Sequence, residues 1–162
     1  MNWKATFAAL LLVTAGPVAQ AADSSCLFFS AKEDDKAGPP LRFAAELSAL
    51  EESAVTDSPG KGRIDFVLDR QSQKFTWKVS YDGLTSPPTG LKVHGPQVPG
   101  AEAAPLFDLA AGGVKSPMEG SRTLSDGEVT YLVQDRLYVN LTTSKYKDGE
   151  LRSPIRKVRP KC

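Results

Sequence analysis

The chain has 162 residues, of which 41% are hydrophobic and 24% are charged. These proportions are typical of a globular protein and exclude a disordered or fibrous one. Because 20 basic residues nearly balance 19 acidic ones, the overall charge does not indicate nucleic-acid binding. One histidine and two cysteines are too few for a metal site that needs several imidazole or thiolate ligands from one chain.

Residues 1–21 have the features of a secretory signal peptide. Lys4 provides a positive charge, residues 5–13 are apolar apart from one threonine, and Ala-Gln-Ala at 19–21 is a small-x-small cleavage site. The apolar run is too short to span about 30 Å of hydrocarbon. We therefore expect cleavage after Ala21, a periplasmic or secreted protein, and no transmembrane segment in the mature chain. Residues 22–162 then form a single domain.

Cys26 and Cys162 lie close to the two ends of the expected mature chain. An even number of cysteines in an oxidising compartment favours a disulfide bond between them. Such a bond would join a first strand, expected at residues 26–30, to the C-terminal tail. Two free thiols are the alternative.

Apolar and polar residues alternate along most of the mature chain, and this period of two predicts β-strands. The alternating positions are Phe43, Ala45 and Leu47; Ile64, Phe66 and Leu68; Phe75, Trp77, Val79 and Tyr81; Leu91 and Val93; Leu137, Val139 and Leu141; and Leu151 and Ile155. Pro154 argues for an edge or a bulge in the last of these strands. Turn-forming pairs such as Asp82-Gly83 separate the segments. This pattern predicts an antiparallel all-β sandwich or barrel.

Residues 125–133 depart from the pattern of alternation. Ser125 and Glu128 have the spacing of a capping box, and Val129, Leu132 and Val133 follow at helical spacing. Alternate apolar positions in the same segment also permit a strand. Because the cap and the helical spacing agree, we expect one short helix here.

Four segments together resemble the CHRD domain, a module named after chordin, over about residues 41–157. They are KFTWKVSYDGL at 74–84, LKVHGP at 91–96, LYVNLTT at 137–143 and DGELR at 148–152. The resemblance implies an immunoglobulin-like Greek-key β-sandwich related to Cu/Zn superoxide dismutase. It also implies a binding role, because the domains of chordin belong to an extracellular binder of growth factors. Bacterial members of the family are exported and mostly lack a defined activity.

The chain departs from the family pattern at three positions. Where family members often carry histidine, this chain has Lys92 and Thr142, and Ser153 replaces the usual glycine. Of the three family histidines only His94 is present. Since a copper site of the superoxide dismutase type needs several imidazoles, we expect no metal, no cofactor and no catalytic residue.

Five residues are candidates for binding: His94, Asn140, Thr142, Glu150 and Arg152. His94 ends a strand; it is a lone ligand or proton-transfer group, or it bonds to backbone or is simply solvated. Asn140 and Thr142 share one side of a strand, where Asn140 instead could tie the strand to a loop. Glu150 and Arg152 alternate on the last strand and could pair with each other or satisfy their neighbours. Residues 140–142 also form a glycosylation sequon.

The sequence therefore predicts an exported, non-enzymatic CHRD-domain protein that binds an unknown protein or envelope polymer. The alternative is a metal-binding protein or an enzyme derived from a superoxide dismutase-like barrel, which would depend on His94. Five cations occupy the last eleven residues: Arg152, Arg156, Lys157, Arg159 and Lys161. They indicate either an acidic partner or an edge strand that is protected from further pairing.

Overall fold

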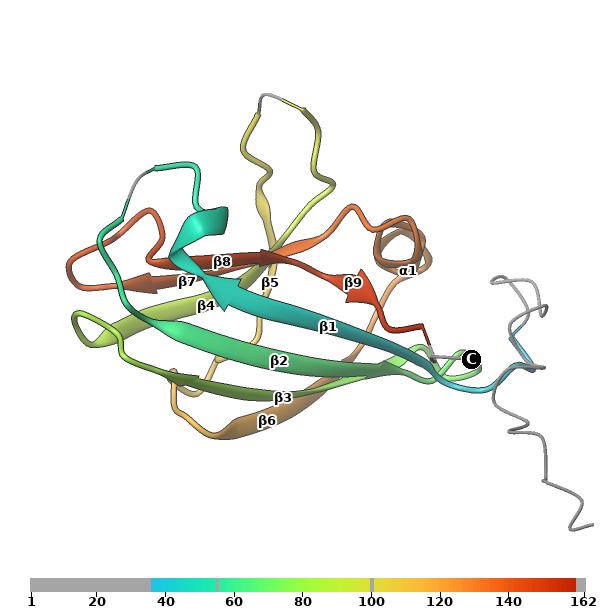
Figure 1. The fold of residues 1–162 in the computed structure, drawn as a ribbon. Coiled ribbons are helices and arrows are strands. Elements are labelled where there is room, and N and C mark those ends of the chain that lie inside the picture. The colour runs from blue at the N-terminus through green and yellow to red at the C-terminus, as the bar shows by residue number, and fades with distance from the viewer. Residues whose placement is uncertain (1–35, 55, 100, 160–162) are drawn as a thin grey trace, which may run out of the picture.

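The computed structural model describes residues 36–54, 56–99 and 101–159, which form one antiparallel β-sheet and one short α-helix (Figure 1). The elements are β1 (Leu41–Ser48), the 3-10 turn η2 (Ala49–Glu51), β2 (Lys61–Leu68), β3 (Lys74–Asp82), β4 (Pro88–His94), β5 (Pro105–Asp108), β6 (Met118–Thr123), α1 (Asp126–Val133), β7 (Tyr138–Thr143), β8 (Leu151–Pro154) and β9 (Arg156–Lys157). The all-β class and the single short helix agree with the sequence.

The sheet is continuous and strongly curled, with the strand order β5-β4-β7-β8-β1-β2-β3-β6 and with β9 beside β1. The sequence predicted two facing sheets of a Greek-key sandwich; the structure instead has one half-barrel. The reason is that β1 pairs with β2 along one side and with β8 and β9 along the other. No break therefore separates two layers within the described strands.

The inner face of the curled sheet holds the hydrophobic core. Side chains alternate between the two faces of a strand, and the inward positions of β1, β2 and β3 are the apolar ones that the sequence predicted, with Leu41 in addition and with Tyr81 only partly buried. The buried side chains of these strands are Leu41, Phe43, Ala45, Leu47, Ile64, Phe66, Leu68, Phe75, Trp77 and Val79. Across the open side of the half-barrel, the Trp77 indole N–H donates to the carbonyl oxygen of Leu109 at 3.2 Å. This bond and the edge-on contact of the Phe75 and Phe107 rings, whose centroids are 6.4 Å apart, join β3 to the opposite end of the sheet at β5.

The short helix α1 begins where its cap predicted. The Ser125 hydroxyl accepts a hydrogen bond from the Glu128 N–H, and the Glu128 carboxylate accepts one from the Ser125 N–H. This capping box satisfies two N–H groups that a helix start leaves without partners. Leu132 is fully buried against the core, so the helical reading is confirmed over the strand.

Strand β6 is an element that the sequence did not predict, as are β5 and the turn η2. Its residues, MEGSRT, show no apolar alternation, and β6 forms because it pairs with β3 from Lys74 opposite Thr123 to Val79 opposite Met118. Pro154 ends β8, and the chain resumes as β9 after one residue. The signal peptide, the expected strand at 26–30 and both cysteines lie outside the described residues.

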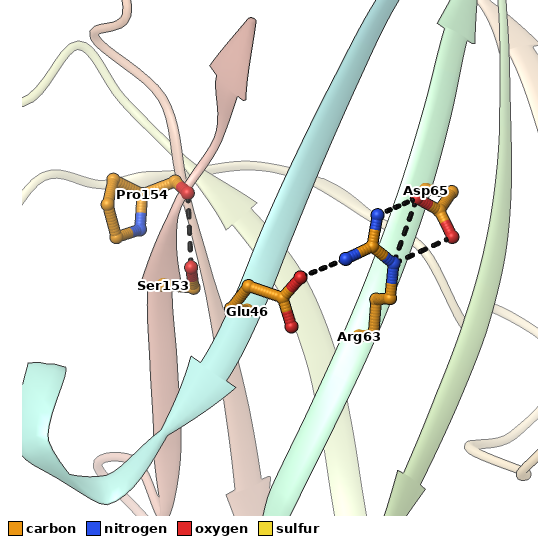
Figure 2. A network of polar contacts seen from close by, with 5 residues as sticks. All are labelled: Glu46, Arg63, Asp65, Ser153 and Pro154. Atoms are coloured by element: carbon orange, nitrogen blue, oxygen red, sulfur yellow. Dashed lines mark hydrogen bonds and ion pairs between the residues drawn. The ribbon is translucent and has the colours of Figure 1, made fainter. Parts of the chain in front are cut away.

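On the outer face of the sheet, charged side chains of neighbouring strands pair with one another. Arg63 on β2 forms ion pairs with Glu46 on β1 and with Asp65 two residues further along β2 (Figure 2). These groups are at least half exposed, so each pair stabilises the fold by only about 0–1 kcal/mol. Among the helices of the described ranges, none is long and apolar enough to span a bilayer.

Candidate functional site

The register of three adjacent strands brings polar side chains together on the outer face of the sheet. Lys92 on β4 lies opposite Asn140 on β7, which lies opposite Arg152 on β8. In the next position along, His94 lies opposite Tyr138. Directly opposed residues of an antiparallel pair share a face, so all five side chains leave the sheet on the side away from the core.

Two loops rise on this side of the sheet and, with the β7–β8 loop, turn the polar face into a pocket. They are the segment after β1, which contains η2, and the β4–β5 loop; both stand above β8 in Figure 1. The pocket has a volume of about 590 Å³. We call it the outer pocket; the residues that line it are Ser53, Ala54, Thr89, Gly90, Lys92, His94, Glu102, Pro105, Asn140, Thr142, Lys147 and Asp148.

His94 fastens the β4–β5 loop to the sheet. Its Nδ1 lies 2.9 Å from the carbonyl oxygen of Ala103; since a carbonyl only accepts, Nδ1 carries the proton and donates it. The Tyr138 hydroxyl donates to the same oxygen at 3.3 Å, and the two rings stack with centroids 5.1 Å apart. The backbone bond weighed in the sequence analysis is therefore present, and it shapes the pocket wall.

Arg152 connects both loops to β8. Its guanidinium lies over the Tyr138 ring, 3.8 Å from the centroid, and Nη1 is 3.0 Å from a carboxylate oxygen of Glu102. The same carboxylate accepts a hydrogen bond from the Ser53 hydroxyl. The Ser53 bond, followed by the bond and the charge of Arg152, lowers the pKa of Glu102 despite some burial. The loops are thus held in place before any ligand arrives.

Asn140 ties β7 to the loop that precedes β8. This is the second of the two roles that the sequence analysis gave for Asn140. Its Nδ2 donates to the carbonyl oxygen of Asp148 at 2.7 Å, and the side chain is buried. Its Oδ1 is also buried but has no hydrogen-bond partner among the described residues, and the same holds for Oε1 of Glu52.

Sequence reasoning missed Glu52, as it missed Ser53 and Glu102. Burial raises its pKa to about 7, although the positive charge of Arg152 opposes this shift. Nothing in the sequence distinguishes Glu52 from its exposed neighbour Glu51, because the burial comes from contacts with distant strands.

Thr142 lines the outer pocket from β7. Its hydroxyl lies 3.0 Å from that of Thr89 on β4, so the two threonines form a cross-strand pair. Gly90 leaves room for this pair, because a Cβ at that position would lie 2.9 Å from the Thr142 hydroxyl oxygen.

Glu150 lies outside the outer pocket. It is fully buried and accepts hydrogen bonds from the Ser58 hydroxyl, the Thr143 hydroxyl and the Thr85 N–H, at 2.6, 2.6 and 2.7 Å. Burial by itself would raise the pKa of Glu150, but these bonds outweigh it and lower the pKa. Glu150 and Arg152 therefore satisfy separate neighbours, and the structure places Glu150 as an internal anchor.

The basic residues near the C-terminus have different surroundings. Arg152 is buried in the pocket wall, whereas Arg156 on β9 is exposed and lies 3.9 Å from a carboxylate oxygen of Asp135. Arg159 ends the described part of the chain, and Lys161 lies beyond it. An acidic partner for this tail stays a prediction.

The outer pocket offers both charges and hydroxyl groups to a ligand. Lys92 and Lys147 contribute ammonium groups, Glu102 and Asp148 carboxylates, and the threonine pair hydroxyls. Within the described ranges, no three His, Cys, Asp or Glu side chains gather as metal ligands would. The arrangement is suited to hydrogen bonding and ion pairing with a polar ligand.

Comparison with known proteins agrees with the strands that build this pocket. A search of curated proteins found no match to the chain. The family model of the CHRD domain matches residues 43–155, which include nearly all of β1 and every other strand up to β8. Because the match spans more than half of its length and contains the outer pocket, this chain belongs to the CHRD domain family.

Proposed function

We propose that this CHRD-domain protein is an exported, non-enzymatic binding module that holds a protein or polymer of the cell envelope in its outer pocket. The observation that carries the proposal is the pocket itself. Three loops and two strands line it with polar side chains, and its volume is about 590 Å³. Ligand pockets are commonly concave and largely formed in advance. The signal-peptide features of residues 1–21 support a periplasmic or extracellular location.

The lining suggests the chemistry of the ligand. Lys92 and Lys147 favour carboxylate groups, while the Thr89–Thr142 pair and Asn140 suit hydroxyl and amide groups. His94 bonds through Nδ1 to the β4–β5 loop, which supports a positioning role for this ring. We therefore expect a polar segment with acidic and hydroxyl groups, from a polypeptide or a polysaccharide.

A substitution that fills the pocket tests this proposal. Thr142→Arg places a long side chain in the pocket, whereas Thr123→Arg adds the same charge on an exposed position of the distant strand β6. After cross-linking to isolated envelope fractions, we expect Thr142→Arg to reduce capture of the bound component by about tenfold or more, which corresponds to about 1.4 kcal/mol.

The control variant is expected to capture as much as the unsubstituted protein. Equal capture by both variants, with circular dichroism showing both folded, would place the binding surface elsewhere and refute a role for the outer pocket.

A further inference from the structure

Two buried oxygen atoms beside the outer pocket have no hydrogen-bond donor within the part of the chain that the structure describes. They are Oε1 of Glu52 and Oδ1 of Asn140. Both lie beside Gly149: a Cβ on this glycine would be 2.5 Å from the Glu52 oxygen and 2.6 Å from the Asn140 oxygen. Gly149 also has a φ of +153°. Glycine is therefore needed here, because a side chain at this position would take the space that the two oxygens occupy.

The orientation of the Asn140 amide is fixed by a second contact. Its Nδ2 donates to the carbonyl oxygen of Asp148 at 2.7 Å. Turning the amide over would lose this hydrogen bond and press Oδ1 against the Asp148 carbonyl oxygen. A buried acceptor that receives no hydrogen bond is costly, and both oxygens are in that state among the described residues. A proton on the Glu52 carboxyl group removes the conflict, since the acid then donates to Asn140.

The charges around Glu52 come from three elements. Arg152 on β8 favours the carboxylate form, whereas Glu102 in the β4–β5 loop opposes it, and Tyr138 on β7 also lies within electrostatic range. The Arg152 guanidinium is already bonded to Glu102 and stacked on Tyr138. His94 is close enough to Glu102 to influence its charge. Burial outweighs the attraction of Arg152, and the raised pKa of Glu52 agrees with the unpaired oxygens.

We propose that Glu52 is a carboxylic acid that donates its proton to Oδ1 of Asn140, and that loss of this proton loosens the wall of the outer pocket. On ionisation the proton passes to solvent, and the carboxylate then faces an oxygen that carries no donor. Glu52 immediately precedes Ser53, whose hydroxyl bonds to Glu102 across the pocket wall. The strain therefore acts directly on the segment that carries this bond.

The proton can be observed by NMR without any ligand, so the result is independent of the proposed binding function. In protein labelled with ¹³C at glutamate carboxyl groups, we expect the Glu52 signal to titrate near pH 7. The Asn140 side-chain amide and the Ser53 backbone amide should shift with the same midpoint. A Glu52 midpoint near 4.5, the ordinary value, or a Ser53 signal that does not follow it, would overturn the proposal.

Two substitutions assign the titration. Glu52→Gln provides a permanent N–H donor to Asn140, so the Ser53 and Asn140 signals should become independent of pH between about 5 and 8. Glu51→Gln changes an exposed neighbour and should leave the titration unchanged. Calcium chloride or sodium chloride should cause no saturable shift of these signals; such a shift would mean that a cation, and not a proton, lies between the two oxygens.

Thermal unfolding provides a second measurement with a definite sign. The pKa of Glu52 is higher in the folded protein than its ordinary value, so the folded state binds more protons between pH 4.5 and about 7. Stability must then fall as the pH rises through this interval. We expect Glu52→Gln to remove this part of the decline in Tm, whereas Glu51→Gln should retain it. An identical slope for all three proteins would contradict the assignment.

Discussion

Replacing Glu150 with alanine is expected to lower the free energy of unfolding by about 3 kcal/mol. The carboxylate is fully buried and accepts three hydrogen bonds, from Ser58, Thr143 and the Thr85 backbone. Alanine would leave the Thr143 hydroxyl and the Thr85 N–H without an acceptor, and buried unsatisfied groups are costly. Urea denaturation of the two proteins measures the loss.

A matched control separates this effect from the loss of one negative charge. Glu119 on β6 is exposed and forms a long ion pair with Lys78, at 3.6 Å. Glu119→Ala should therefore change stability by no more than about 0.5 kcal/mol. If the two alanine variants unfold at the same urea concentration, Glu150 does not anchor the strands.

The ionisation of Glu150 adds a dependence on pH. Its pKa is lowered in the folded protein, so its contribution is present above the ordinary pKa and is lost as the pH falls through the lowered value. Glu150→Gln should be destabilised at neutral pH and should lose less stability than the parent protein on acidification. This dependence lies at lower pH than that of Glu52 and has the opposite sign.

Arg152→Ala is the second substitution with a large expected effect, a loss of about 2–3 kcal/mol. Breaking a fully buried ion pair costs about 3–5 kcal/mol; we expect less because the Glu102 side chain is 58% exposed, whereas that of Arg152 is 10% exposed. The substitution also uncovers the Tyr138 ring, on which the guanidinium stacks. Arg156→Ala, at an exposed position of β9, is the control.

Arg152→Ala should also raise the pKa of Glu52. The positive charge of Arg152 lowers the pKa of Glu52, so its removal should move the Glu52 midpoint to higher pH in the NMR titration. Arg152→Lys keeps the charge but loses the planar stacking on Tyr138. We expect the Glu52 midpoint of Arg152→Lys to lie close to that of the parent protein. Its free energy of unfolding should lie between those of the parent protein and Arg152→Ala. An unchanged midpoint in Arg152→Ala would show that the two side chains do not interact.

Particular residues show how far sequence reasoning reached. The periodicity of Phe43, Phe66 and Phe75 predicted buried positions, and all three are buried. The capping box at Ser125 predicted the start of α1. Three of the five candidate binding residues, His94, Asn140 and Thr142, line the outer pocket. The sequence assigned Glu150 to binding because strand alternation predicts which face a side chain lies on. It does not predict the distant residues that donate hydrogen bonds to that side chain.

The amino-acid sequence by itself determined the antiparallel strands, the short helix and the CHRD relationship. These depend on alternation, caps, turns and motifs, each of which involves only a few neighbouring residues. Only the tertiary structure decided that the strands form one curled sheet, that β6 is a strand, and that Glu52 shares a buried space with Asn140. The physical reason is that pairing and burial depend on groups far apart in the chain. A carboxylate becomes a buried acid only when remote strands exclude water from it.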